Sequence, residues 1–386
     1  MAETQLALDL KSDENLILLN PRWPQGDFQK LKSLAEAVQA ERGLKGHVWI
    51  ATSGSTAESA SATKLVALSK KAIISSAESV NKHLNSTAAD VWTQVLPHFH
   101  VGGFGIEVRA LLSGARVVPA LQDSKWNVDH FYQVLIDEKC TLSALVPTQV
   151  FDLVEKGYKS PSSMRAIVVG GGALDSVLFD KARALGWPLL PSYGMTETAS
   201  QIATADLGSL AGFEYPDIEL LSHADARVNE AGFLEVTAQS LFTCYAQNTS
   251  KGMEHWDPKK ENWFTTEDRG VVVGRALKIQ GRSKDYVKIG GEGTNVARLR
   301  TLLEQAVMDL NPQWVMQVTL LDMPSERLGA EIHLISTLSD DANRKIAESY
   351  SAKVLPFEKI RKSHTVLEIP RSDLGKILWQ QLKNLL

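Results

Sequence analysis

The sequence predicts an α/β protein with a large N-terminal domain of mainly parallel sheets flanked by helices and a small, mobile α+β C-terminal domain. Short apolar runs alternate with amphipathic stretches from about residue 47 to 205, which is typical of strands and crossover helices. The helical period fades between about 218 and 281, which indicates a β-rich subdomain. The last hundred or so residues mix both patterns. We therefore expect domains at residues 1–281 and 282–386.

The expected elements of the first domain follow from apolar spacing. Strands are predicted at residues 47–50, 91–96, 116–118, 143–146 and 166–169. Helices are predicted at residues 128–138 and 148–157, and along two apolar stripes: Ile73, Ala77, Val80 and Leu84; and Leu174, Val177, Leu178, Ala182 and Leu185. Gly and Ser cluster where these strands end, and ligands bind at such strand ends in open α/β sheets.

The remaining chain predicts a β-rich segment and a small mixed domain. Strands are expected at residues 232–237, 271–279, 315–321, 331–336 and 365–369, with a helix along Val296, Leu299, Leu302, Leu303 and Val307. No long polar linker separates the two domains, so a tight hinge near residues 281–285 is expected. Domains that meet at a short hinge can move relative to each other.

Composition narrows the class of protein. The chain has 386 residues, 44% hydrophobic and 22% charged, which favours an ordinary globular fold. Its 41 basic and 45 acidic residues give a net charge of -4, so no nucleic-acid partner is expected. Cys140 and Cys244 have no metal or redox spacing, and neither a leader nor an apolar membrane span is apparent. We expect a cytoplasmic protein.

Two polar segments could bind phosphate: one follows the predicted strand at residues 47–50, and the other, residues 191–198, follows the apolar run at residues 187–190. Residues 52–56 (Thr-Ser-Gly-Ser-Thr) precede Lys64, and hydroxyls, backbone N–H groups and a lysine suit phosphate oxygens. The alternative is an ordinary Ser/Thr turn. In the second segment Tyr193 could stack on a base, Thr196 could bond phosphate and Glu197 could hold Mg²⁺. The alternative there is a loop that leads to a helix N-cap.

Further candidates lie in the histidine segment and in the last third of the chain. His98 and His100 would point the same way on an extended segment, but no third metal ligand lies nearby in the sequence, so a packed or substrate-facing histidine is favoured. Asp268 could accept hydrogen bonds from ribose hydroxyls, or belong to a turn. Lys376 follows a predicted strand, where a lysine is usually a solvated charge.

Taken in order, these segments resemble the adenylate-forming superfamily of acyl-CoA synthetases, adenylation domains and luciferases. The resemblance covers the chain from about residue 47 to its end. Within the superfamily, residues 143–149 and 192–202 are most similar to the o-succinylbenzoate-CoA ligases of menaquinone biosynthesis.

The resemblance implies an ATP-dependent ligase that forms an acyl-AMP and then an acyl-CoA thioester from a small carboxylic acid, with Mg²⁺ and CoA. It implies catalytic roles for Lys376, Thr196, Glu197 and His100, with Glu197 also as the metal ligand and Lys284 as the hinge. It implies cofactor-binding roles for Ser53, Gly54, Ser55, Thr56, Lys64, Gly170, Gly171, Gly172, Tyr193, Gly194, Asp268, Arg282, Gly290 and Gly291.

Two alternatives stay open. The acid could be another aryl or medium-chain acid. The chain could also be a non-catalytic nucleotide or acyl-adenylate binding protein, which is favoured by Ala57 in place of the usual glycine and by the stretched spacing from Thr56 to Lys64. Glu267 before Asp268 and the short stretch ahead of the loop are further departures, and a homo-oligomer stays open as the assembly state. The joint presence of Glu197, Asp268, Arg282 and Lys376 argues against the binding protein.

Overall fold

The computed structural model describes residues 9–52, 63–282, 285–289, 292–325, 327–373 and 375–386. The chain divides into two compact units. Unit 1 comprises Met1–Ala226, Val236–Thr265 and Val273–Leu277, and unit 2 comprises Arg227–Glu235, Thr266–Val272 and Lys278–Leu386. Each unit is described by itself below. No helix of the described residues is long and apolar enough to cross a bilayer.

A mainly parallel sheet forms the centre of unit 1. Its strands run in the order β10-β9-β8-β7-β6-β4-β5, and those from β8 to β5 pair in parallel. The strands are β4 (Val91–Gln94), β5 (Arg116–Pro119), β6 (Leu142–Leu145), β7 (Ala166–Val169), β8 (Leu189–Met195), β9 (Ser200–Thr204) and β10 (Ile218–Leu220). Every residue of β6 and β7 is buried, as expected for parallel strands covered on both faces.

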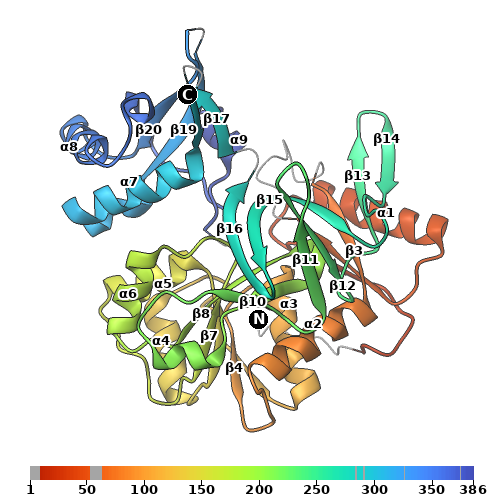
Figure 1. The fold of residues 1–386 in the computed structure, drawn as a ribbon. Helices are drawn as coiled ribbons and strands as arrows, with labels where there is room; N and C mark the ends of the chain where they lie inside the picture. Colours follow the sequence, from red (N-terminus) through yellow and green to blue (C-terminus); the bar gives the residue numbers. More distant parts are fainter. Residues whose placement is uncertain (1–8, 53–62, 283–284, 290–291, 326, 374) are drawn as a thin grey trace. The chain divides into compact units, whose positions relative to one another are not determined.

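Helices cover this sheet on both sides. Figure 1 shows α4 (Val128–Asp137), α5 (Pro147–Glu155) and α6 (Ser176–Ala184) beside one face of β7 and β8. On the other side lie α2 (Lys70–His83) and α3 (Val101–Ser113), which pack on each other. The predicted helices are confirmed, with shifts of one to two residues where their ends were predicted. Side-chain caps from Ser69, Asn127 and Asp175 fix the starts of α2, α4 and α6.

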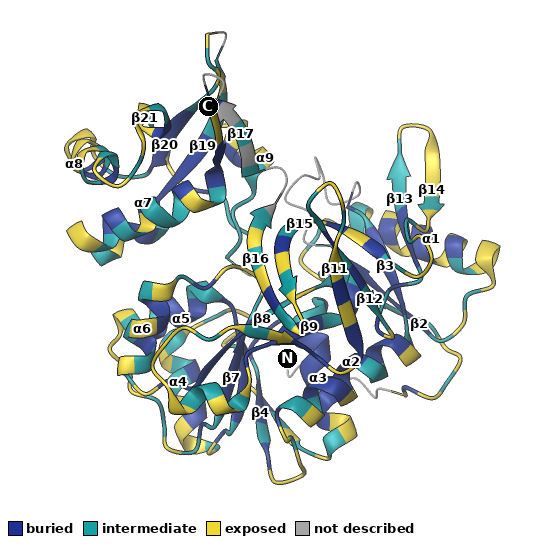
Figure 2. Cartoon of the chain, in the orientation of Figure 1, coloured by how far each residue is buried: buried dark blue, intermediate teal, exposed yellow. Residues whose placement is uncertain are grey.

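A second sheet in unit 1 has the order β1-β2-β3-β13-β14. Its elements are β1 (Leu16–Leu18), β2 (His47–Ala51), β3 (Leu65–Ser69), β13 (Cys244–Thr249), β14 (Gly252–Trp256) and the covering helix α1 (Gln25–Arg42). Leu31, Leu34 and Val38 of α1 pack on Trp49 and Ala67 of the sheet. Figure 2 shows the contrast between the buried β2 and β3 and the exposed edge strand β14.

The β-rich segment confirms the predicted change of pattern at about residue 218. It contains β11 (Ala224–Val228), β12 (Phe233–Ala238), β15 (Phe264–Val273) and β16 (Ala276–Arg282). These strands extend the sheet beyond β10 in the order β16-β15-β12-β11, and their residues are divided between the two units. The single strand predicted at 271–279 is wrong. Gly274, at a φ of 59°, turns the chain there, so two strands meet where one apolar run was apparent.

Unit 2 contains a small α+β fold. Its elements are β17 (Tyr286–Ile289), β18 (Glu292–Asn295), α7 (Val296–Leu310), β19 (Val318–Ser325), β20 (Gly329–Ser336), α8 (Asp340–Ser351), β21 (Ile360–Thr365) and α9 (Trp379–Lys383). Helices α7 and α8 pack on the β19-β20-β21 sheet. The strand predicted at 365–369 is wrong: it lies at Ile360–Thr365, because this strand is mostly polar and the apolar period misses it. The strand predicted at 315–321 begins only at Val318, since a 3₁₀ turn precedes it.

Candidate active site

The turn at residues 196–200 joins β8 to β9 and carries the motif around Glu197. A short 3₁₀ helix (Thr196–Thr198) follows β8, and the next two residues have positive φ, 51° at Ala199 and 111° at Ser200. Non-glycine residues in that region carry strain of about 1–3 kcal/mol each, which the surroundings must offset. The buried Thr198 hydroxyl does so by accepting a bond from the Met195 N–H and lying 2.7 Å from the Ser200 carbonyl oxygen.

Gly194 allows this turn to close. A Cβ at that position would lie 2.1 Å from the Ser200 carbonyl oxygen, so no other residue fits without moving the backbone. The alternative interpretation of this motif as a loop is therefore wrong in its first half. Tyr193 and Gly194 belong to β8, paired with β9 across a register shift, and only the residues after Met195 leave the sheet.

Three side chains of unit 1 meet on one side of the turn, and we call them the phosphate-side cluster: Lys64, Glu197 and Tyr245. The Tyr245 hydroxyl donates to Glu197 Oε1 at 2.8 Å, and Lys64 Nζ lies 4.0 Å from the same oxygen. Lys64 Nζ also lies 3.7 Å from the centre of the Tyr245 ring. The Lys64 and Glu197 side chains are 32% and 13% exposed, so a ligand can reach both.

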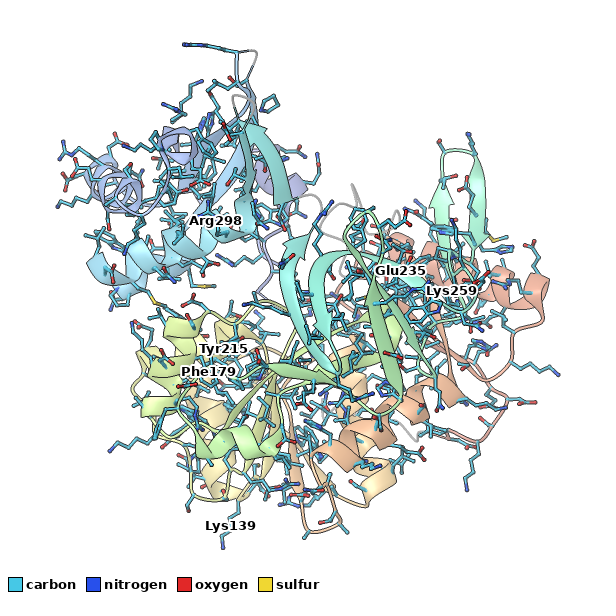
Figure 3. The ribbon with its side chains drawn as sticks, viewed as in Figure 1. Lys139, Phe179, Tyr215, Glu235, Lys259 and Arg298 are labelled. Carbon is cyan, nitrogen blue, oxygen red and sulfur yellow. The ribbon has the colours of Figure 1, made fainter. Side chains whose placement is uncertain are left out.

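The backbone behind Glu197 is anchored from the segment around β13. The Phe242 N–H donates to the Glu197 carbonyl at 2.9 Å, and Lys259 Nζ donates to the Phe242 carbonyl at 2.7 Å. Lys259, labelled in Figure 3, also lies over the Phe242 ring at 4.3 Å. These contacts tie the turn to the second sheet of unit 1.

The phosphate-side cluster suits Mg²⁺ that arrives with a polyphosphate. Both contacts of the Glu197 carboxylate with described residues use Oε1, so Oε2 has no partner among those residues. The part of the chain that the structure describes holds no group of three metal-ligating side chains. Protein-bound Mg²⁺ commonly takes one or two carboxylates and completes its shell with phosphate oxygens and water. The donor set therefore fits a nucleotide-bound Mg²⁺ and does not fit an all-protein metal centre.

Arg109 lies at the other side of the turn, and the sequence motifs do not include it. It is 1% exposed on α3, its Nη2 donates to Ser200 Oγ at 2.9 Å, and its Nε has no hydrogen-bond partner among the described residues. Burial lowers its pKa to about 10, so the guanidinium keeps its charge at pH 7. No described carboxylate forms an ion pair with it. A charged residue within the apolar stretch of α3 was the only signal in the sequence.

A narrow crevice adjoins this arginine, and we call it the Arg109 crevice. It is lined mainly by Ile73, Ala77, Val101, Phe104, Arg109 and Ala199. In this conformation it is too narrow to hold a water molecule. Its apolar walls and single buried cation suit an apolar ligand that carries an anionic group, once side chains move apart to admit it.

His100 and the glycine triplet both belong to unit 1. His100 precedes α3, whose first turn supplies Val101 and Phe104 to the Arg109 crevice, and its ring packs 4.8 Å from that of Phe99. The extended segment on which His98 and His100 would point the same way is not present, because residues 98–99 form a turn. After β7, Gly171 has a φ of 78°, and a Cβ there would lie 3.1 Å from Val146. Gly170 lies close to Ser192, and Gly172 lies near Pro147.

The other predicted site residues belong to unit 2 or lie outside the described residues. Asp268 is 8% exposed within β15, where its N–H donates to the Thr266 hydroxyl, so the alternative that it belongs to a turn is wrong. Lys376 is half-buried in a loop closed by two hydrogen bonds between it and Ser372. Ser53, Gly54, Ser55, Thr56, Lys284, Gly290, Gly291 and the Arg282 side chain lie outside the described part.

The fold and these residues define an AMP-binding enzyme. Residues 17–237 match the family of AMP-binding enzymes. Because the match covers more than half of the chain, the chain belongs to this family. The predicted superfamily and α/β fold are confirmed.

The chain is also similar to individual enzymes. The chain is 25% identical to 2-succinylbenzoate--CoA ligase of Oceanobacillus iheyensis, over 76% of this chain and 61% of the relative. It is 27% identical to the ligase of the same name from Bacillus subtilis, over 80% and 63%. The chain thus spans less than two thirds of the length of these relatives.

Solved structures agree in fold. o-Succinylbenzoate CoA synthetase (MenE) from Bacillus subtilis, in complex with the acyl-adenylate intermediate OSB-AMP, aligns with a TM-score of 0.71 at 24% identity, covering 87% of this chain and 68% of that one. At that identity the likeness shows the fold alone. A single-residue variant of E. coli MenE with bound OSB-AMS aligns with a TM-score of 0.66 at 26% identity, over 87% and 68%.

Proposed function

We propose that the chain is an ATP-dependent acid-CoA ligase that converts o-succinylbenzoate to its CoA thioester through an acyl-AMP, a reaction of menaquinone biosynthesis. Family membership and the names of the relatives support this proposal. One observation carries it: the 196–200 turn has the phosphate-side cluster at one end and the buried Arg109, with no described carboxylate partner, at the other. A single turn thus joins groups suited to a nucleotide and to an anionic acid.

The chemistry requires activation of the acid. A carboxylate resists nucleophiles because of its charge and because oxide is a poor leaving group. In the first half-reaction a carboxylate oxygen attacks the α-phosphorus of ATP, and pyrophosphate leaves. In the second, the CoA sulfur, after losing its proton, attacks the acyl carbon, and AMP leaves. Positioned cations stabilise the charge that moves during the first step.

The residues would divide this work. Glu197 would ligand Mg²⁺, which when bound neutralises phosphate charge. Lys64 would contact the β- and γ-phosphates together with residues 53–56, and Thr196 the α-phosphate. Tyr193 would stack on adenine and Asp268 would accept from the ribose hydroxyls. These roles follow from the family resemblance, and the contacts of Lys64 and Glu197 support two of them.

The C-terminal part would complete the site. Lys376 would bridge the acid and the α-phosphate during adenylation. A swing about Lys284 would then exchange this lysine for a thiol path lined by Gly290 and Gly291, while Arg282 would contact the nucleotide. The expected boundary at residue 281, the cytoplasmic location and the oligomeric state likewise stay predictions.

Arg109 supports a dicarboxylic acid as the substrate. o-Succinylbenzoate has two carboxylates, and only one becomes the acyl-AMP. The other stays charged and needs a buried cationic donor if it enters an apolar site. Arg109 offers that donor. It donates a hydrogen bond to Ser200 Oγ and lies in the wall of the otherwise largely apolar Arg109 crevice. A monocarboxylic aryl or medium-chain acid would leave the guanidinium without a carboxylate.

Pyrophosphate release against a panel of acids, with and without CoA, tests the proposal. We expect o-succinylbenzoate to give the highest rate in the panel, and CoA to increase turnover. Higher rates with monocarboxylic acids would reject the substrate and keep the reaction. ATP binding with no release for any acid would reject the ligase in favour of a binding protein.

A further inference from the structure

Tyr245 touches both charged members of the phosphate-side cluster. Its hydroxyl donates to Glu197 Oε1 at 2.8 Å, and its ring face lies 3.7 Å from Lys64 Nζ. The two contacts use different parts of the side chain, the hydroxyl for the carboxylate and the ring for the ammonium.

The strand register explains why these groups meet. In the antiparallel pairing of β13 with β3, Tyr245 lies opposite Val66, and Lys64 directly precedes β3, two residues before Val66. Glu197 arrives from the turn, where its carbonyl accepts from the Phe242 N–H. The cluster thus joins three segments of unit 1.

The ring has little freedom to move. Tyr245 is 4% exposed, and its ring lies 4.5 Å from that of Phe242 and 5.2 Å from that of Trp256. Packing of this kind uses the ring alone, and a phenylalanine would satisfy it. The hydroxyl contact with the carboxylate is an addition that packing does not require.

A fixed hydroxyl sets the direction of the carboxylate. Because both contacts of Glu197 fall on Oε1, Oε2 is the oxygen left for a metal among the described groups. Hydrogen bonds behind a metal ligand fix its orientation, and losing one typically lowers metal affinity about 10–100-fold. A cation over an aromatic face is similarly held in one place.

We propose that Tyr245 is a positioning residue for the magnesium nucleotide: its hydroxyl orients Glu197 toward Mg²⁺, and its ring holds Lys64 for the phosphates. This inference rests on the proposed function, in which Glu197 and Lys64 serve those two ligands. It assigns a role to a residue that the sequence motifs do not contain.

Two variants separate the two contacts. Tyr245→Phe removes the hydroxyl and keeps the ring, whereas Tyr245→Leu removes both. Phe264→Leu is the matched control, because Phe264 packs in the same aromatic group, 5.2 Å from Phe242, and no described contact joins it to Glu197 or Lys64. Thermal unfolding of each variant reports the packing loss by itself.

The readout is ATP binding by calorimetry over a range of Mg²⁺ concentrations, with pyrophosphate release measured in parallel. For Tyr245→Phe we expect the Mg²⁺ concentration for half-maximal ATP binding to rise about tenfold, with ATP affinity at saturating Mg²⁺ retained. For Tyr245→Leu we expect a further loss of ATP affinity at saturating Mg²⁺, about 3–10-fold. Phe264→Leu should change neither quantity.

An unchanged Mg²⁺ dependence in Tyr245→Phe would overturn the inference, whatever the unfolding temperature. A shift of the same size in Phe264→Leu would also overturn it, since packing would then explain the effect. Calorimetry needs neither acid nor CoA. A wild-type protein that binds the magnesium nucleotide but releases no pyrophosphate would therefore reject the ligase alone, and the Tyr245 comparison would still decide this inference.

Discussion

The two ends of the 196–200 turn differ in the partners and in the burial of their charged side chains. At the phosphate-side cluster, Glu197 already has a hydroxyl and an ammonium as neighbours, and both charged side chains remain partly exposed. In the Arg109 crevice, a fully buried guanidinium has one hydroxyl acceptor and no carboxylate among the described residues. The first end suits a ligand that brings its own cation. The second suits a ligand that brings only negative charge.

The largest expected effect tests whether these two regions suffice for the reaction. Lys376 belongs to unit 2, outside both. We expect Lys376→Ala to slow acyl-AMP formation about 10²–10³-fold, since it removes a positioned cation from the transition state. Thioester formation from supplied acyl-AMP should be retained, as measured by CoA-dependent AMP release. Equal loss of both half-reactions would contradict the assigned role.

His223 is a second buried basic side chain that can be compared with Arg109. Burial lowers the pKa of both side chains, but the consequence for their charge differs. The ring nitrogens of His223 have no partner among the described residues, and burial lowers its pKa to about 4. The unfolded imidazole binds a proton below about pH 6.5 while the folded one stays neutral, so stability falls as pH drops from about 6.5 to 4. Arg109 instead keeps its charge.

We expect His223→Phe to remove this part of the acid sensitivity. Relative to wild type, its free energy of unfolding at pH 4 should gain about 3 kcal/mol over the difference seen at pH 7. Urea denaturation at the two pH values measures both differences. Parallel loss of stability in the two proteins would show that His223 is protonated in the folded chain.

Arg109→Leu removes the buried cation at the second end of the 196–200 turn. The variant should raise the KM for o-succinylbenzoate about 30-fold, because a charge-assisted hydrogen bond contributes about 2 kcal/mol. An aryl acid that lacks the second carboxylate should be unaffected. Replacing a buried unpaired charge by an apolar side chain should leave the unfolding temperature unchanged or raise it. Equal losses with both acids would mean that the arginine has only a structural role.

The smallest effect concerns the link between the two ends. Ser76 is 2% exposed, and its hydroxyl donates to the Ala199 carbonyl at 3.0 Å, within the strained part of the turn. Ser76→Ala should cost about 1 kcal/mol of unfolding free energy. It should also lower kcat/KM for the acid more than ATP affinity, which steady-state kinetics can separate. An unchanged kinetic profile would mean that the turn holds its shape without this bond.

The fold was largely predictable because strands such as β6 and β7 are short, fully buried runs separated by amphipathic helices. Residues 166–169 are the clearest case, predicted and observed as the same four-residue strand. Helix α1 carries a readable apolar stripe, Leu31, Leu34, Ala35 and Val38, although no helix was predicted there. Strand β21 could not be found by apolar period, since its residues are mostly polar.

The site was predictable only where local motifs carry it. Glu197 and Lys64 stand in recognisable segments, but Tyr245 lies 48 positions from Glu197, and Arg109 lies 91 positions from Ser200. Such pairs depend on strand register and helix placement. The positive φ of Ala199 and Ser200 is likewise set by the surrounding bonds, because neither residue type favours that conformation.

The proposed function requires that this chain make an acyl-AMP from an acid with two carboxylates. Mass spectrometry of a single turnover with ATP, Mg²⁺ and o-succinylbenzoate, without CoA, tests it most directly. We expect an adduct of the acid with AMP, formed together with an equal amount of pyrophosphate. Bound, intact ATP with no adduct, from a protein that is folded and saturated with both substrates, would contradict it.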